Sequence, residues 1–286
     1  MSTIVIGLSI GMLLFLLASG LTVIFGTLGV VNFAHGAMYS FGAYLTWQAI
    51  SWTNSFWLGL VFAPFIMAAV GFVFEILCLR KTYSRDHVLQ LLVTFGLVLI
   101  LDEAAKVIWG LDYKNVSTPS LLAGTWSVAG TEVAIYRLFV IAFGGVISFA
   151  LFAVIDHSRA GMILRASETH APMVRCLGIK VDSVRTTVFA VGSGLAALGG
   201  AIASPLLPIQ PGAGFTIIID SFLVVLIGGL GNIRGAIFSA LAIGMGRALG
   251  QRWLPDWVDI LTYAILVGVL ILSPQGLFGR GPGRKG

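Results

Sequence analysis

Long runs of apolar residues, separated by short polar stretches, dominate this chain. Six of the runs come close to the length of about 20 residues that a helix needs to cross a bilayer. These runs lie at about 4–27, 56–79, 88–109, 134–155, 186–207 and 257–273. They are too long for the strands of a membrane β-barrel, which need only about 10 alternating residues each. The pattern therefore predicts a bundle of membrane-spanning α-helices.

Two further runs, at about 29–50 and 220–250, are apolar but interrupted by glycines. Counting them, we expect an all-α, polytopic transmembrane helical bundle of about eight membrane segments. Pro64 falls inside one of the runs, where it would kink the helix. The first run has neither a basic segment before it nor a small-residue cleavage site after it. It is therefore interpreted as a retained span rather than a signal peptide.

Composition supports a membrane protein and argues against a soluble domain. Hydrophobic residues make up 58% of the chain and charged residues only 10%, whereas a soluble domain carries about 25% charged residues. The net charge of +5 requires no nucleic-acid partner, because basic loops facing an anionic lipid leaflet give the same excess. Cys78 and Cys176 lie far apart, and the residues around them show neither a disulfide framework nor metal-ligand spacing.

The positive charges predict which side of the membrane each loop faces. The first 79 residues contain no Lys or Arg. Most of the basic residues then cluster in three segments, which the positive-inside rule assigns to the cytoplasm. They are Arg80, Lys81 and Arg85; Arg159, Arg165, Arg175, Lys180 and Arg185; and Arg280, Arg284 and Lys285. The loops at about 110–133 and 208–219 are then external. Arg247 and Arg252 fit this assignment badly.

Two short sequences near opposite ends of the chain resemble each other. TVIFGTLG at 22–29 matches VVLIGGLG at 224–231, and an asparagine follows each match, Asn32 and Asn232. GAMYS and GAIFS then follow in the same order. The matches indicate a possible internal repeat, with copies that are either parallel or inverted. Its halves would be residues 1–130 and 131–286.

The glycines of both matches let the backbone leave the helix and let neighbouring segments approach closely. Backbone groups freed in this way must face protein or a wet cavity, because lipid cannot satisfy them. Paired breaks of this kind indicate a transport pathway near the membrane midplane; the alternative is tight helix packing without a pathway. The candidate path residues are Asn32, His35, Gly36, Ser40, Gly229, Gly231, Asn232 and Gly235. We favour asparagine over histidine, because only the asparagine recurs in both copies.

Ionisable groups in apolar surroundings have two interpretations here. His35 is a functional candidate because it lies in a membrane segment, but we favour the alternative that it is a neutral histidine bonded to a helix carbonyl. Asp102 and Lys106 are four residues apart and can pair on one helix face. We interpret them as a structural ion pair rather than a proton relay.

The longest polar stretch, at 156–186, mixes apolar residues with charged ones. Pro172 limits any single helix, so we expect two short helical pieces. Gly178 has the position of a glycine that ends a helix. A surface helix with apolar anchors and basic flanks suits docking into a groove on a partner; the alternative is a basic loop held against lipid headgroups.

Three motifs make the chain resemble a known family. They are GVVNFAHGAMYSFGAYL, RAGMILRASETHAPMVRCLGIKVDSVR and VVLIGGLGNIRGAIFSALAIG. Their order and spacing resemble the permease subunit of bacterial branched-chain amino acid ABC importers, the shorter of the two homologous permeases of such systems. The resemblance covers nearly the whole chain and implies a single permease domain, 1–286. Arg234 is a departure, since relatives usually have proline or a small residue there.

The resemblance implies that the segment at 156–186 couples to a cytoplasmic ATPase, with Arg165, Glu168 and Gly178 as its coupling residues. It also implies a second homologous permease, two ATPase subunits and a periplasmic or external solute-binding protein, at the bacterial plasma (inner) membrane. The solute would be a branched-chain amino acid or a related small polar solute. Urea and short amides are alternatives, because relatives transport them.

The chain has no phosphate-binding loop of its own, because no lysine follows a glycine anywhere in it. ATP must then be bound and hydrolysed by a partner subunit, and no cofactor is expected in this chain. An ion-coupled secondary transporter is a weaker alternative, since its few acids, Glu75 and Asp220, are placed near span ends. An intramembrane enzyme would depend on Ser40 and His35, whose five-residue spacing faces poorly on one helix.

Overall fold

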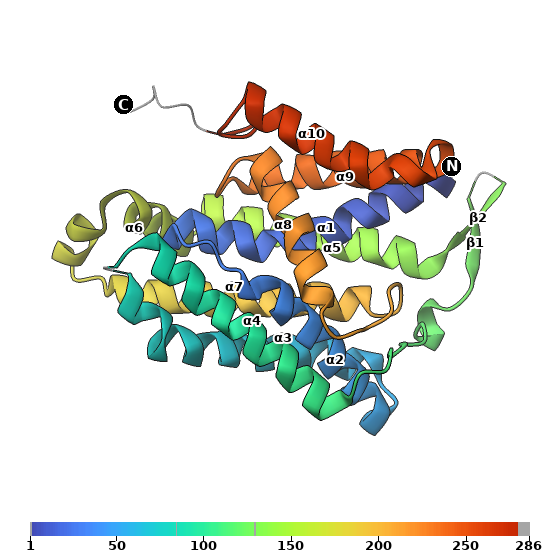
Figure 1. Ribbon diagram of the computed structural model, residues 1–286, viewed down its shortest axis with the longest axis horizontal. Helices are drawn as coiled ribbons and strands as arrows, with labels where there is room; N and C mark the ends of the chain where they lie inside the picture. Colours follow the sequence, from blue (N-terminus) through green and yellow to red (C-terminus); the bar gives the residue numbers. More distant parts are fainter. Residues whose placement is uncertain (1, 84, 129, 280–286) are drawn as a thin grey trace.

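The computed structural model describes residues 2–83, 85–128 and 130–279, which form a bundle of long helices (Figure 1). The helices are α1 (Ser2–Leu28), α2 (Ala34–Thr53), α3 (Phe56–Leu77), α4 (His87–Trp109), α5 (Ile135–His157), α6 (Arg159–Cys176), α7 (Val181–Ala203), α8 (Ala213–Gly228), α9 (Ile233–Trp253) and α10 (Val258–Leu272). Short 3-10 turns are η1 (Leu79–Thr82), η2 (Ser120–Leu122) and η3 (Pro255–Trp257), and one hairpin pairs β1 (Thr125–Val128) with β2 (Thr131–Ala134). The predicted basic residues Arg280, Arg284 and Lys285 lie outside the described residues.

The helical membrane bundle predicted from the sequence is confirmed. Within the described residues, six helical stretches are long and apolar enough to cross a membrane, those of α1, α3 with η1, α5, α7, α9, and η3 with α10. The predicted segments correspond to α1–α5 and α7–α10, so the expected number of about eight is approximate. The run at 220–250 contains parts of two helices, because α8 ends at Gly228 and α9 begins at Ile233.

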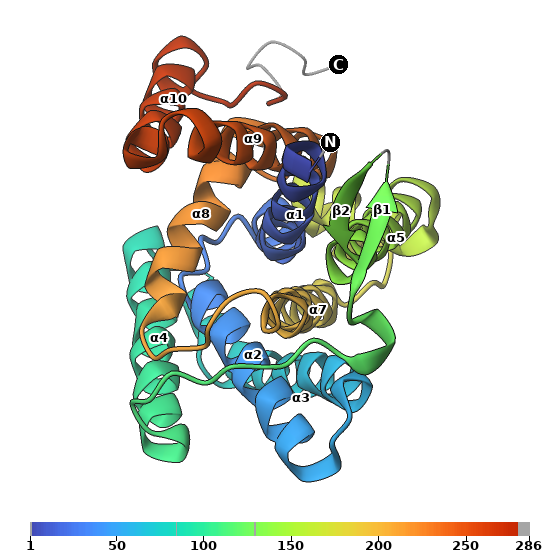
Figure 2. The same ribbon diagram turned by 90° about the vertical axis from the view of Figure 1, so that its right-hand side faces the viewer.

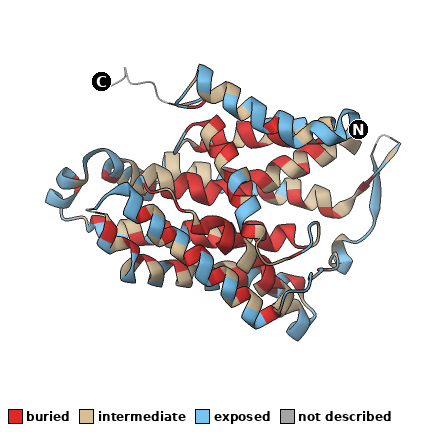
Figure 3. Cartoon of the chain, viewed as in Figure 1, coloured by how far each residue is buried: buried red, intermediate tan, exposed pale blue. Residues whose placement is uncertain are grey.

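The centre of the bundle is formed by α1 and α7, whose apolar windows are 61% and 72% buried. Figure 2 shows α1 and α7 enclosed by α5, α9, α8, α2 and α3. Small residues permit this packing: a Cβ added at Gly20 of α1 would lie 2.5 Å from the carbonyl oxygen of Gly192 in α7. Figure 3 shows buried residues concentrated on these central helices and exposed ones on α10 and on the segment around α6.

The two ends of the bundle agree with the sides that the charges predict. Helix α6 lies at one end, and the N-terminus and the β1–β2 hairpin lie at the other (Figure 1). The two loops expected to be external meet there, because Lys114 and Ile209 exchange two backbone hydrogen bonds of 2.9 Å. We call the opposite end, which carries α6, the α6 end.

The basic residues that fitted badly are explained by their contacts. Arg247 of α9 forms a bidentate ion pair with Asp220 of α8, with N–O distances of 2.6 and 2.9 Å. This pair neutralises a charge inside the bundle. Arg252 donates to the Thr3 hydroxyl at 3.1 Å, at the end where the chain begins. The expected position of Asp220 near a span end is wrong, since the residue lies in the middle of α8.

Candidate translocation and coupling site

The first glycine break, residues 29–33, separates α1 from α2. Gly29 has a φ of +63°, a conformation that glycine adopts without strain. The Asn32 side chain is fully buried, and its Oδ1 accepts a hydrogen bond of 3.0 Å from the Ala34 N–H. Its Nδ2 has no hydrogen-bond partner among the described residues. Asn32 therefore satisfies backbone at the start of α2 and retains one unused donor.

The residues after this break are held inside α2 by packing. His35 is fully buried, and its Nε2 lies 2.7 Å from the carbonyl oxygen of Leu17 in α1. This contact fits the interpretation of a histidine bonded to a helix carbonyl. A Cβ at Gly36 would overlap the backbone of Gly214, so this glycine lets α2 and α8 touch. The Ser40 hydroxyl is buried, with no hydrogen-bond partner among the described residues.

The second break, residues 229–232, separates α8 from α9. Gly229 and Gly231 have φ values of +94° and +76°. Asn232 is the N-cap of α9, and its Oδ1 accepts from the Gly235 N–H at 3.2 Å. The Asn232 Nδ2 donates to the Phe278 carbonyl at 2.7 Å. The asparagine therefore begins the following helix here too, but every polar atom of its side chain has a partner.

The second break lies against the end of α1, just before the first break. A Cβ at Gly231 would lie 2.8 Å from the Cα of Gly26, in the last turns of α1. In Figure 1, α1 runs toward the α6 end and α2 and α9 both run back from it, whereas α8 crosses the bundle steeply. The main packing partner of α1 is α9, and α8 packs against both α2 and α9. The two similar sequences are therefore in contact, and the helices that follow them, α2 and α9, share one direction.

Helix α6 has the two-piece form that Pro172 predicts. His170 has a non-helical φ of −143° and ψ of +62°, which kinks the helix at that point. Gly178 has a φ of +80°, and the Ile179 N–H then donates to the Val174 carbonyl at 3.4 Å. This pairing is a helix-ending glycine motif, so the predicted role of Gly178 in local structure is confirmed.

Apolar side chains project from this otherwise polar segment. Met162, Met173 and Leu177 are 63%, 68% and 75% exposed. Exposed methionine and leucine among charged residues are typical of a surface that another protein covers.

A cavity of about 700 Å³ at the α6 end brings predicted coupling residues and predicted path residues together. Arg165 and Glu168 of α6 line one side, and Gly231 and Asn232 of the second break line the other. Asn32 and His35, by contrast, lie in the buried core, and Gly178 lines a separate cavity.

One carboxylate that the sequence did not single out joins the two sides of this cavity. Asp156, in the last turn of α5, accepts from Arg234 of α9 at 2.6 Å and lies 3.7 Å from an Arg165 nitrogen. Arg165 also donates to the Ile155 carbonyl. The Arg234 guanidinium lies 4.9 Å from the centre of the Phe152 ring. Arg234, a departure from the family, was the one signal in the sequence that could have led to this contact.

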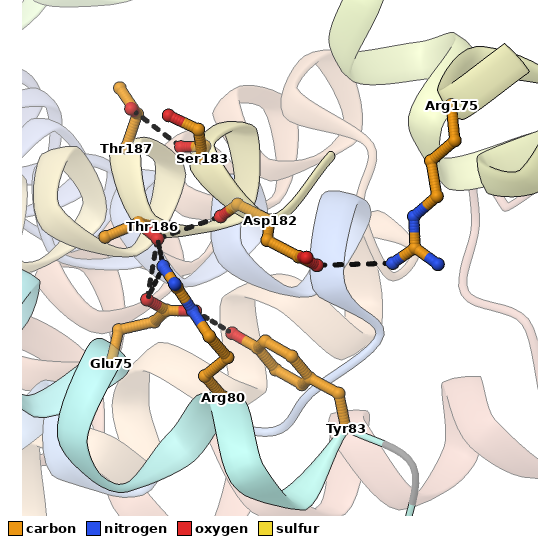
Figure 4. Close-up of polar contacts among 8 residues, drawn as sticks. All are labelled: Glu75, Arg80, Tyr83, Arg175, Asp182, Ser183, Thr186 and Thr187. Atoms are coloured by element: carbon orange, nitrogen blue, oxygen red, sulfur yellow. Dashed lines mark hydrogen bonds and ion pairs between the residues drawn. The ribbon is translucent and has the colours of Figure 1, made fainter. Parts of the chain in front are cut away.

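Glu75 lies in a second polar cluster, shown in Figure 4. It is fully buried and pairs with Arg80 at 3.1 Å. The Thr186 and Tyr83 hydroxyls donate to the same carboxylate at 2.7 and 3.1 Å. Burial, together with the Glu75 charge, raises the pKa of Tyr83, so its hydroxyl stays protonated as a donor. A carboxylate with three such partners is a structural group that joins α3, η1 and α7.

The pair near the other end of the bundle is also structural. Lys106 lies 2.8 Å from Asp102 and 2.7 Å from Glu103. The second Asp102 oxygen accepts from the Gly212 N–H at 2.6 Å, which fixes the loop before α8. The predicted pairing of Asp102 with Lys106 is confirmed.

Comparison with known proteins agrees with this geometry. The family described as the permease component of the branched-chain amino acid transport system matches residues 3–270. LivH, a high-affinity branched-chain amino acid transport permease of Escherichia coli, is 29% identical, covering 96% of this chain and 94% of LivH. BraD of Pseudomonas aeruginosa, described in the same terms, is 29% identical with the same coverage. A LivM permease of Methanocaldococcus jannaschii is 24% identical over 79% of this chain and 68% of its own length.

Two solved structures share the fold. PsaBC from Streptococcus pneumoniae, in complex with Fab, aligns with a TM-score of 0.52 and 11% identity, covering 94% of this chain and 91% of that chain. A chain described as a metal-chelate type ABC transporter in an inward-facing conformation aligns with a TM-score of 0.50 and 20% identity, covering 95% and 85%. At these identities the likeness concerns the fold alone.

The helical bundle is that of a multi-pass membrane protein, and the proteins it matches are transport components rather than enzymes. The chain belongs to the family of permease components of branched-chain amino acid transport systems. It is accordingly the membrane-spanning subunit of an ATP-driven transporter, and ATP is hydrolysed by partner subunits.

Proposed function

We propose that this chain is one of two permeases of a bacterial inner-membrane importer for branched-chain amino acids or a closely related small polar solute. The second permease, two cytoplasmic ATPase subunits and an external solute-binding protein complete the assembly. The names of the LivH and BraD relatives support the solute class. The presence of LivH-like and LivM-like relatives supports a pair of homologous permeases.

The observation that carries the coupling part of the proposal is the cavity between α6 and the second break. Arg165 and Glu168 are the residues proposed to receive the ATPase, and both line this cavity. Asp156 joins Arg165 to Arg234, two residues beyond the break. Motion of α6 would therefore reach the start of α9 through one side chain. Gly178, which ends α6, would fix the far end of the docking segment.

We further propose that the glycine breaks line the solute path, with Asn32, Gly36 and Ser40 from the first copy, whereas His35 packs against α1 through the Leu17 carbonyl. Gly229, Gly231, Asn232 and Gly235 would contribute from the second. The common direction of α2 and α9, the helices that follow the two breaks, supports a parallel internal repeat, 1–130 and 131–286, within one permease domain (Figure 1). The unused donor of Asn32 supports this residue as the best candidate for solute contact.

Reconstitution of the assembly in vesicles tests this function. The chain with its permease, ATPase and binding-protein partners should accumulate radiolabelled leucine when ATP is supplied. Unlabelled valine and isoleucine should compete, whereas urea and acetamide should not. Competition by urea or acetamide alone would assign the solute to the amide class. ATP-driven accumulation by this chain alone would refute the proposed assembly.

The coupling residues are tested in the same vesicles. Arg165→Gln and Glu168→Gln should each leave binding-protein docking intact while ATP hydrolysis continues without accumulation of solute. Cys78→Ser, an exposed position at the end of α3, is the matched control and should transport normally. Normal transport by both α6 variants would show that the coupling role is misplaced.

A further inference from the structure

A second cavity, of about 630 Å³, lies at the α6 end between α3, the end of α6 and the start of α7. One wall is apolar, formed by Phe72 and Ile76 of α3. Three basic residues, together called the basic wall here, also line the cavity: Arg80 on the α3 side, and Arg175 and Lys180 on the side of α6 and α7. Figure 4 shows Arg80 and Arg175 on opposite sides of the space in front of α7.

The basic wall retains positive charge after its internal contacts are counted. Arg80 uses its guanidinium on Glu75 and Thr186, and Arg175 lies 3.2 Å from Asp182. Lys180 is exposed and has no ion-pair partner among the described residues. The carboxylates of Glu75 and Asp182 balance two of the three cations, which leaves the positive charge of Lys180. The wall can therefore hold a further anion.

The N-terminus of α7 faces the same space. Val181, Asp182 and Ser183 line the cavity, and no side chain caps the first turn of this helix. Free backbone N–H groups at the start of a long helix favour an anionic group. This feature adds to the three cations and alone would not define a site.

The apolar wall continues onto the outer surface of a membrane-spanning helix. Phe72 is 47% exposed, and its neighbours Val73 and Leu77 are 51% and 57% exposed. They belong to the stretch Phe56–Thr82, which is long and apolar enough to cross the membrane. The cationic and apolar walls meet where α3 ends and η1 begins, the position expected for headgroups.

We propose that this groove binds an anionic phospholipid of the cytoplasmic leaflet. The phosphate would lie among Arg80, Arg175 and Lys180, and an acyl chain would follow Phe72 and Ile76. Basic pockets between membrane helices at this level suit anionic headgroups. Free phosphate shares the headgroup chemistry but gains nothing from the apolar wall. The lipid would contact the end of α6 and so hold the docking segment at the membrane surface.

Spin-labelled lipids test the site on the full chain in bilayer discs. The immobilised fraction of labelled phosphatidylglycerol should exceed that of labelled phosphatidylcholine. Lys180→Gln, at an exposed side chain, should lower this preference about fivefold. Arg175→Gln should do the same, because each removes one cation. Arg159→Gln, on the same α6 end but outside the cavity, is the matched control and should retain the full preference.

Two further arms distinguish the lipid from other occupants. Inorganic phosphate at millimolar concentration should displace little labelled phosphatidylglycerol. Phe72→Ala should reduce immobilisation, and its folded yield should stay unchanged because this side chain is 47% exposed and packs little against the core. The proposal is overturned if phosphate displaces the lipid completely, or if Lys180→Gln and Arg159→Gln behave alike. Loss of the preference when the partner ATPase is added would assign the groove to the ATPase and also overturn it.

Discussion

The two glycine breaks have similar sequences but different surroundings. We call the first break closed because Asn32 is fully buried and its neighbours Val30 and Ala34 belong to the core around α1 and α7, although Gly29 is exposed. We call the second break open because Gly231 and Asn232 line a cavity of about 700 Å³ at the α6 end. Glycines thus allow close packing in both copies, and in the second copy the break also lines a cavity.

This difference indicates which break can respond to a partner. A break enclosed by close-packed side chains cannot shift without disturbing the core. The second break has free space beside it and is linked through Asp156 to α6. We therefore expect the second break to move with the ATPase and the first to provide the fixed side of the path.

The largest effect is expected where both copies depend on glycine. A Cβ at Gly36 would overlap the Gly214 carbonyl oxygen, and one at Gly235 would overlap that of Gly228. Gly36→Ala and Gly235→Ala should therefore each lower the free energy of unfolding by about 1–3 kcal/mol or more. Thermal unfolding of the detergent-solubilised protein measures the change.

Gly246→Ala is the matched control on α9, because nothing lies within 4 Å of its added Cβ. It should raise stability by up to about 1 kcal/mol through helix propensity. If Gly235→Ala were as stable as Gly246→Ala, the close contact between the end of α8 and the start of α9 would be incorrect.

Replacing each asparagine should distinguish the two breaks by the stability that is lost. Asn32→Ala leaves the buried Ala34 N–H without its acceptor, which should cost about 1–3 kcal/mol. Asn232→Ala removes a partly exposed N-cap and should cost about 1 kcal/mol. Chemical denaturation of both variants gives the comparison. If Asn232→Ala lost more stability than Asn32→Ala, the assignment of the first break as closed and the second as open would be reversed.

His35 should matter less for transport than for packing. His35→Phe removes the bond to the Leu17 carbonyl and should cost about 1 kcal/mol of stability. The KM for leucine in reconstituted vesicles should stay within about twofold of wild type, since the ring is fully buried and bonded to the Leu17 carbonyl of α1. A rise in KM of about tenfold or more would instead place the histidine in the solute path.

Much of this architecture could be predicted from apolar runs, because each run is long enough to span a bilayer. The start of each break was also predictable, since Gly29 and Gly229 adopt conformations that other residues avoid. The glycines after the first break were harder to interpret. Gly36 interrupts nothing in α2, and its role is visible only when Gly214 packs against it.

The contacts that join distant segments could not be predicted. Asp156 follows an apolar run, as loop acids commonly do, and only folding brings Arg234 to it from 78 positions away. The position of Asp220 was wrong because the break at 229–232 divides the apolar run and makes Asp220 central to α8. The β1–β2 hairpin lies in a polar loop whose four-residue strands are too short to give a periodic signal.

The central claim is that Asp156 transmits ATPase motion from α6 to the second break. In the pair of Asp156 with Arg234, the arginine side chain is 65% exposed. Breaking this pair should therefore lower the free energy of unfolding by only about 0–1 kcal/mol. Any large effect on transport would then reflect coupling. Arg252→Gln, at the other end of α9, is the matched control.

The most direct measurement is the number of ATP molecules hydrolysed per leucine transported by the complete assembly. Asp156→Asn and Arg234→Gln should each raise this ratio by about tenfold, and the double variant should raise it no further, as expected for residues that act through one contact. Asp156→Glu should restore most of the coupling. An unchanged ratio in Asp156→Asn, or fully additive effects in the double variant, would contradict the account.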